Sequence, residues 1–194
     1  MFMQELKERI VKEGKVLPGN IIKVDGFLNH RIDTTLMSHI AEEFGRHFNM
    51  DEVTMILTAE ASGIALSAIV AQHFGKPMIF AKKAKSDNIE GGLYQSDIFS
   101  YTYKKKVTLL VSKEWISAED KVLIIDDFMA NGEAMRGLCD IVTAAGATLV
   151  GIGCAVEKGF QGGGDRLRAA GVNLKSLAII ESAEPGNIVF RDEE

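Results

Sequence analysis

Apolar positions along this 194-residue chain follow first a helical period and then a strand period. Near the amino terminus Met3, Leu6 and Ile10 recur every three to four residues, which predicts an amphipathic helix that ends near Gly14. A turn at 18–20 separates it from a second predicted helix, which Thr34 or Thr35 could cap and which runs to about residue 49. The amino-terminal quarter therefore reads as two helices joined by a short mixed segment.

From residue 53 onward, apolar runs of strand length alternate with helical stretches. The predicted strands lie at 53–58, 78–82, 98–103, 106–112, 122–126, 148–158 and 174–182, and the predicted helices at 64–74 and 132–145, with a short helix after three consecutive glycines. Strands separated by helices of this length predict βαβ units, so the fold class is α/β with a mainly parallel twisted sheet flanked by helices. The runs at 98–103 and 106–112 are close enough for a hairpin, and the polar stretch 83–96 between them and the preceding strand predicts a mobile lid loop.

Composition limits what the chain can do. With 46% hydrophobic and 25% charged residues, residues 1–194 are expected to form a single domain around one core. A net charge of −5 disfavours nucleic acid as a partner and favours a small molecule. Apolar runs too short to cross a membrane and the lack of a secretory signal predict a cytoplasmic location, and Cys139 and Cys154 are expected to be free, buried thiols.

The segment 122–134, VLIIDDFMANGEA, carries the clearest chemical signal. Asp126 and Asp127 follow a buried strand and offer only acceptors, which suits the two hydroxyl donors of a ribose. The helix that starts just after them presents free backbone N–H groups, which suit a phosphate. A strand-end pair of acids followed by an ordinary Asn-Gly turn is the plain structural alternative. A receiver domain is excluded by length, since 67 residues follow Asp127 and such a domain needs about 120 with the acids in its first strand.

These residues resemble the phosphoribosyl pyrophosphate signature of the type I phosphoribosyltransferase family, in which a hydrophobic strand and two acids precede Thr-Gly-Gly-Thr. Gly132 is kept, while Asn131, Glu133 and Ala134 replace the family's Thr, Gly and Thr. The resemblance implies that the phosphate is bound by residues 130–134, and the lost hydroxyls shift the expected contacts to the backbone of Ala130, Asn131, Gly132, Glu133 and Ala134. A carboxylate about 6 Å from a phosphate would repel it by roughly 3 kcal/mol, so the Glu133 side chain is expected to point to solvent.

The likeness to the family's xanthine-using subgroup runs from Leu6 to the last strand, on FLNH at 27–30, EASGIA at 60–65 and EKGFQ at 157–161. It implies a small hood built from residues 1–35 and the C-terminal strand. It also implies that a pyrophosphate loop, often with a non-proline cis peptide, spans Glu60, Ala61, Ser62 and Gly63, and that Lys82 and Lys83 neutralise pyrophosphate. A homodimer, with a basic residue reaching across its interface, is implied as well.

For the purine base the resemblance points to Ile22, Asn29 and Lys158. A lysine only donates, so Lys158 can bond a purine O6 and cannot pair with the amino group of adenine. The expected activity is transfer of a 5-phosphoribosyl group to xanthine, with Asp126 and Asp127 as the catalytic residues, Mg²⁺ arriving with phosphoribosyl pyrophosphate, and no metal site of the protein's own. Guanine or hypoxanthine specificity stays open. A repressor-like sensor of the same donor is disfavoured because only about thirty residues precede the core.

Overall fold

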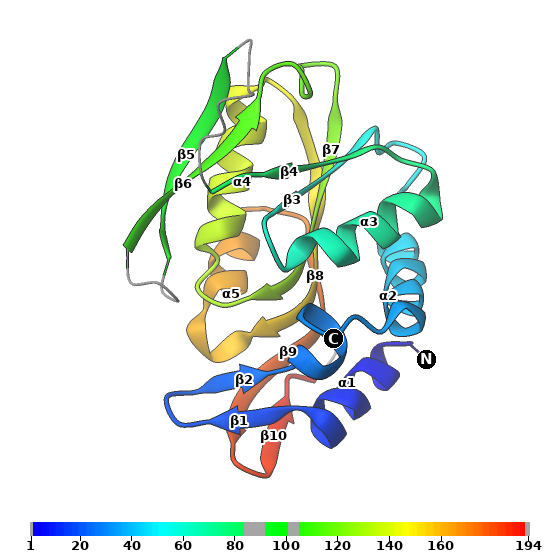
Figure 1. The fold of residues 1–194 in the computed structure, drawn as a ribbon, viewed down its shortest axis with the longest axis vertical. Helices are drawn as coiled ribbons and strands as arrows, with labels where there is room; N and C mark the ends of the chain where they lie inside the picture. Colours follow the sequence, from blue (N-terminus) through cyan, green and yellow to red (C-terminus); the bar gives the residue numbers. More distant parts are fainter. Residues whose placement is uncertain (1, 84–91, 101–104, 193–194) are drawn as a thin grey trace.

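The computed structural model describes residues 2–83, 92–100 and 105–192 (Figure 1). Its helices are α1 (Phe2–Glu13), α2 (Thr34–His47), α3 (Gly63–Phe74), α4 (Glu133–Ala144) and α5 (Gly163–Ala169), with a π-helical turn η1 (Asp25–Asn29) and a 3-10 turn η2 (Gly159–Gln161). Its strands are β1 (Lys15–Leu17), β2 (Ile21–Lys23), β3 (Met55–Ala59), β4 (Met78–Ala81), β5 (Leu93–Ser100), β6 (Lys105–Ser112), β7 (Lys121–Met129), β8 (Thr148–Lys158), β9 (Leu174–Glu184) and β10 (Asn187–Phe190).

A six-stranded sheet in the order β10-β9-β8-β7-β3-β4 forms the centre of the molecule. All of its neighbouring strands are parallel except β10, which runs antiparallel to β9. In Figure 1, α2 and α3 lie on one side of the sheet and α4 and α5 on the other. The expected α/β class with a mainly parallel sheet is confirmed.

Strand β7 explains why the run VLII is apolar without interruption. Leu123 and Ile125 belong to the core shared with α1, α2 and α3, whereas Val122 and Ile124 belong to the core shared with α4 and the β5-β6 hairpin. A parallel strand covered on both faces has no solvent side, so alternation disappears from its sequence. Because β7 lies between β8 and β3, its carboxyl end lies near the middle of the row of strand ends, and ligands bind beyond these ends in such folds.

A small group of elements covers that edge from one side. The β1-β2 hairpin turns through Gly19 and Asn20 at positive φ, of 82° and 59° respectively, and leads into η1. Helix α1 packs against β9 and β10, which brings the chain's first and last elements together at the lower end of Figure 1. These elements correspond to the expected hood.

Several boundaries differ from the sequence prediction. Asp33 caps α2, because its Oδ1 accepts from the Leu36 N–H at 3.1 Å, so neither predicted threonine does so. Strand β5 begins at Leu93, which makes the last four residues of the predicted lid 83–96 part of a strand, and positions 84–91 of that lid lie outside the described residues. Strand β10 was not predicted at all.

Two smaller expectations concern the thiols and the membrane. Cys139 and Cys154 are both free; Cys154 is buried and Cys139 partly so, and burial raises the pKa of Cys139 to about 11. Within the described residues, no helix is both long and apolar enough to cross a bilayer.

Candidate active site

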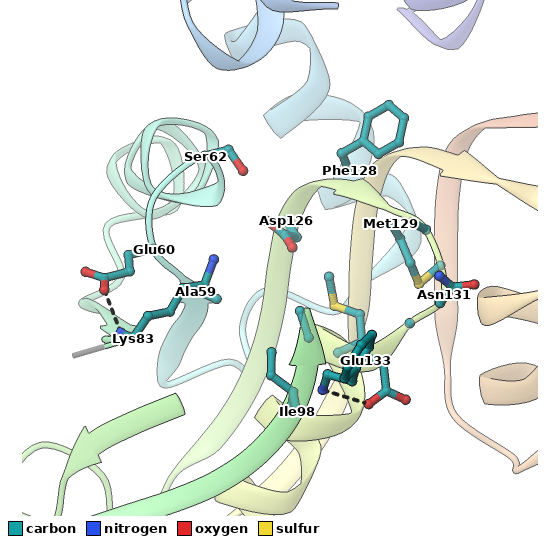
Figure 2. Close-up of a pocket in the computed structure, with 15 residues that line it drawn as sticks. Ala59, Glu60, Ser62, Lys83, Ile98, Asp126, Phe128, Met129, Asn131 and Glu133 are labelled. Carbon is teal, nitrogen blue, oxygen red and sulfur yellow. Dashed lines mark hydrogen bonds between the residues drawn. The ribbon is translucent and has the colours of Figure 1, made fainter. Parts of the chain in front are cut away.

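The acidic pair lies inside β7, which extends to Met129, and its two carboxylates go to different places. Asp126 lines a pocket of about 200 Å³, together with the loop 130–134 and residues of β3 and β5 (Figure 2). Asp127, which is 1% exposed, is not among the described residues of that wall, and its Oδ2 instead accepts from Asn29 Nδ2 of the hood at 2.9 Å. Asp126 therefore borders the pocket while Asp127 contacts the hood, as alternation along a strand favours, and the two carboxyl groups still interact with each other.

Asp126 sits in an electrostatically costly position. Its burial, and secondarily the negative charge of Asp127, raise the pKa of Asp126 well above its ordinary value. The nearby positive charge of Lys83 opposes this shift, but as a smaller effect. A carboxyl group so placed gains from any cationic ligand that enters the pocket.

Gly63 makes room for this carboxylate. A Cβ at Gly63 would collide with Asp126 Oδ1 and with Thr58 Oγ1, which is buried without a hydrogen-bond partner within the described structure. The glycine therefore permits a close approach between the first turn of α3 and the end of β7. Gly63, which the resemblance places in the pyrophosphate loop, thus has a packing role at this position.

The predicted phosphate loop, residues 130–134, is placed as expected for an anion cradle. Gly132 adopts φ 78°, a left-handed conformation that favours glycine, and α4 begins at the next residue. Among the described residues, no side chain caps the start of α4, and its first residues line the pocket together with the loop, so the pocket is bordered by Ala130, Asn131, Gly132, Glu133 and Ala134. All five predicted residues thus lie together with Asp126.

Glu133 corrects one expectation, since its side chain does not simply point to solvent. Its carboxylate is 33% exposed and forms an ion pair with Arg136 Nη2 at 3.2 Å. It also accepts a hydrogen bond of 3.4 Å from the Phe99 N–H, the dashed line beside Glu133 in Figure 2. Hydrogen bonding to Arg136 lowers the pKa of Glu133, so its charge is kept and its repulsion of a phosphate is offset by a neighbouring cation instead of by distance.

The predicted pyrophosphate loop borders the same pocket. Glu60 and Ser62 line it, and the peptide bond Glu60–Ala61 is cis, one bond before Ala61–Ser62, where the resemblance had left a cis peptide open. The Glu60 carboxylate accepts from the Lys83 N–H, as Figure 2 shows. Of the two predicted lysines, Lys83 lines this pocket, whereas Lys82 pairs with Leu110 and lines a separate apolar cavity beside β4 and β6.

The residues proposed for the base gather around the hood. Lys158, at the end of β8, donates to the Asn20 carbonyl at 3.0 Å and lies 5.5 Å from the centroid of the Phe128 ring. Burial lowers the pKa of Lys158. Asn29 reaches Asp127, and Ile22 is 7% exposed and packs in the hood's core, which places its side chain in the interior.

Sequence reasoning missed Phe128, a half-buried residue that lines the pocket and whose ring points away from Asp126 (Figure 2). Its position directly after the acidic pair could have signalled it, because an aromatic side chain there offers a flat apolar surface to a planar ligand.

The acidic pair also bears on how the protein could hold a magnesium ion. Among the described residues, no cluster of three histidine, cysteine or acidic side chains could hold a metal by itself. Asp127 Oδ1 is nevertheless buried without a hydrogen-bond partner, next to Asp126. Two carboxylates of this kind match Mg²⁺, which proteins commonly bind through one or two acids together with substrate phosphates.

Comparisons with known proteins agree with this geometry. Residues 27–170 match the family model described as a phosphoribosyl transferase domain. The chain is 53% identical over 192 residues to the xanthine phosphoribosyltransferase of Bifidobacterium longum, covering 97% of this chain and all of the relative. It is 52% identical over 194 residues to that of Lachnoclostridium phytofermentans, covering 99% of this chain and all of the relative.

Solved structures share the fold at low sequence identity. The adenine phosphoribosyltransferase of Saccharomyces cerevisiae superposes with a TM-score of 0.75 at 20% identity, covering 91% of this chain and 98% of that one. The enzyme of the same name from Rhodothermus marinus gives a TM-score of 0.72 at 22% identity, covering 91% and 97%. Taken with the acidic pair, the phosphate loop and the full-length relatives, these matches show that the chain belongs to the phosphoribosyltransferase family.

Proposed function

We propose that this protein is a xanthine phosphoribosyltransferase, which transfers the 5-phosphoribosyl group of phosphoribosyl pyrophosphate to xanthine and releases pyrophosphate. The observation that carries the reaction is the pocket that Asp126 lines together with the phosphate loop and with Glu60 and Ser62. The choice of xanthine rests on the relatives of that name, which are about half identical over their full length.

Different residues of this pocket would bind different parts of phosphoribosyl pyrophosphate. Loop 130–134 and the start of α4 would bind the 5-phosphate, and the backbone at Glu60 to Gly63 with Lys83 would face the pyrophosphate. Asp126 would lie beside the ribose, where its negative charge stabilises the positive charge that develops on the sugar as the bond to pyrophosphate breaks. Ligand binding would also offset the cost of burying this charge.

Asp127 would act on the base side. Its bond to Asn29 joins the end of β7 to the hood, so the two acids link ribose recognition to base recognition. Lys158 would donate to an oxopurine oxygen, and the Phe128 ring would supply a stacking surface for the base. Mg²⁺ carried by the donor would supply positive charge to the departing pyrophosphate.

Direct product detection tests this proposal. The protein is incubated with phosphoribosyl pyrophosphate, Mg²⁺ and xanthine, and mass spectrometry follows the nucleoside monophosphate while a coupled assay follows pyrophosphate. We expect both products in equal amounts, and expect neither when xanthine or Mg²⁺ is left out. Pyrophosphate release that does not require a base would contradict transfer to xanthine, and specific DNA binding without turnover would favour the sensor alternative.

Two further parts of the proposal concern assembly and closure. We propose a homodimer, on the family resemblance, and light scattering at assay concentration would give a mass near 42 kDa for a dimer of this 21.2 kDa chain. A lid within 83–96 also remains a prediction, and Lys83 at its start borders the pocket.

A further inference from the structure

The phosphate loop packs backbone to backbone against the first turn of α5. A Cβ at Gly163 would meet the Ala130 carbonyl oxygen and backbone atoms of Asn131 and Gly132 within 2.7 Å, and a Cβ at Gly132 would lie 3.3 Å from Gly163. Two glycines therefore allow the loop and α5 to approach closely. The conformation of the loop depends on this support as well as on α4, the helix that the loop starts.

Arg166 stabilises this contact between the phosphate loop and α5 with two hydrogen bonds. Its Nη2 donates to the Asn131 carbonyl at 3.0 Å, and its Nη1 lies 3.4 Å from the Gln161 carbonyl. The guanidinium thus bridges the phosphate loop and the turn that leads into α5. Among the described residues that line the pocket is Asn131, whose carbonyl Arg166 binds, and not Arg166 itself.

The bridge formed by Arg166 matters because the phosphate loop lacks the threonine hydroxyl groups of the family signature. Asn131 and Ala134 stand where the family signature has threonines, so the loop has lost hydroxyl groups that could bond a phosphate. Its remaining donors are backbone N–H groups, whose directions depend on the loop's shape. A guanidinium holds a planar, two-pronged geometry that an ammonium group cannot reproduce.

We infer that Arg166 is a positioning residue for the 5-phosphate: it holds the Asn131 peptide so that the loop's N–H groups converge on the phosphate. This inference rests on the proposed function for the identity of the substrate. Because the loop is in place before the substrate arrives, the residue acts on ground-state binding, which appears in KM for phosphoribosyl pyrophosphate more than in kcat.

The test compares Arg166→Met, which keeps the aliphatic stem, and Arg166→Lys, which keeps the charge. Arg46→Met is the matched control, since Arg46 is a half-exposed arginine at the end of α2 that pairs with Glu43, away from the pocket. Each protein is assayed for kcat, for KM of both substrates and for melting temperature. Isothermal titration with ribose 5-phosphate measures phosphate binding without turnover.

For Arg166→Met we expect KM for phosphoribosyl pyrophosphate, and Kd for ribose 5-phosphate, to rise about fivefold to tenfold, as befits the loss of a charge-assisted bond at an exposed site. KM for xanthine and kcat should change less than about twofold. Arg166→Lys should fall between Arg166→Met and the unmodified chain, and Arg46→Met should leave all constants unchanged.

Three outcomes would overturn the inference. Arg166→Met could match Arg46→Met in phosphate binding, or it could weaken both substrates equally with a matching loss of thermal stability, which would indicate a merely structural role. Full function in Arg166→Lys would show that charge alone suffices. If the unmodified chain turned over no purine, the proposed function would fail while the ribose 5-phosphate titration still decided the role of Arg166.

Discussion

Replacing Asp126 by asparagine should make the protein more stable and less active. Asp126 is 7% exposed and Asp127 is 1% exposed, so two adjacent carboxylates have lost most of their hydration. Asparagine has the same shape and keeps an oxygen to accept the Asp127 N–H, as Asp126 Oδ1 does now at 3.1 Å. The substitution therefore removes a buried charge without removing the hydrogen bond.

The size of the gain follows from the repulsion between the two acids. A hydrogen bond between the two carboxyl groups contributes to the raised pKa of Asp126, so they lie close together, and at about 4 Å and an effective dielectric near 20 two like charges repel by about 4 kcal/mol. Part of this repulsion is already relieved because the raised pKa of Asp126 lets the folded protein hold a proton there. We expect Asp126→Asn to raise the free energy of unfolding by about 1 to 2 kcal/mol at pH 8, or about 3 to 6 °C in melting temperature.

The gain should depend on pH in one direction. The folded protein retains the Asp126 proton where the unfolded chain has lost it, so this group reduces stability as pH rises from the ordinary value of 3.8 through the raised folded pKa. Asparagine does not titrate. The stability difference between variant and unmodified chain should thus be small near pH 4 and grow toward pH 8.

Activity should fall for the same electrostatic reason. Losing a well-placed charge beside the forming ribosyl cation costs about 3 kcal/mol, or about a hundredfold in kcat. The assay pairs urea unfolding at pH 4 to 8 with steady-state kinetics, and Asp51→Asn, at an exposed acid before β3, serves as the control. A stability difference that shrinks as pH rises, or a kcat that Asp126→Asn leaves intact, would refute this reasoning.

Three further substitutions test separate parts of the site. Glu133→Gln should lower KM for phosphoribosyl pyrophosphate about fivefold in steady-state assays, because it removes a partly screened negative charge next to the phosphate; an increase would contradict the predicted repulsion. Gly63→Ala should lower kcat at least tenfold and destabilise the protein by about 1 to 3 kcal/mol, because the added methyl displaces Asp126; Gly26→Ala, where a Cβ meets nothing within 4 Å, is its thermal and kinetic control. Lys158→Gln should raise KM for xanthine about tenfold and leave KM for the donor unchanged, and equal effects on both substrates would argue against a base contact.

The sequence predicted most of the fold because the determining signals were local. The uninterrupted run before Asp126 marked a strand buried on both faces, and β7 has that position. Strand β10 escaped prediction because it is four residues long and depends on pairing with β9, a tertiary contact. The cap of α2 was assigned one or two residues late because Asp, Thr and Thr are consecutive and all can cap.

The sequence predicted which residues line the pocket better than it predicted how they are arranged. Residues 130–134, Glu60, Ser62 and Lys83 do meet Asp126 in one pocket, as the position of the strand ends suggested. The separation of Asp127 toward Asn29 follows from strand alternation once β7 is known to continue past the acids. Arg166 had no sequence signal, because its role arises from the packing of α5 against a loop 35 residues earlier.

The measurement that tests the central claim most directly is kcat/KM for xanthine, guanine, hypoxanthine and adenine, with saturating phosphoribosyl pyrophosphate and Mg²⁺. We expect xanthine to give the highest value, the other two oxopurines to be lower, and adenine to be the poorest substrate, because Lys158 can donate to an oxygen and cannot accept from an amino group. A preference for adenine would contradict the account.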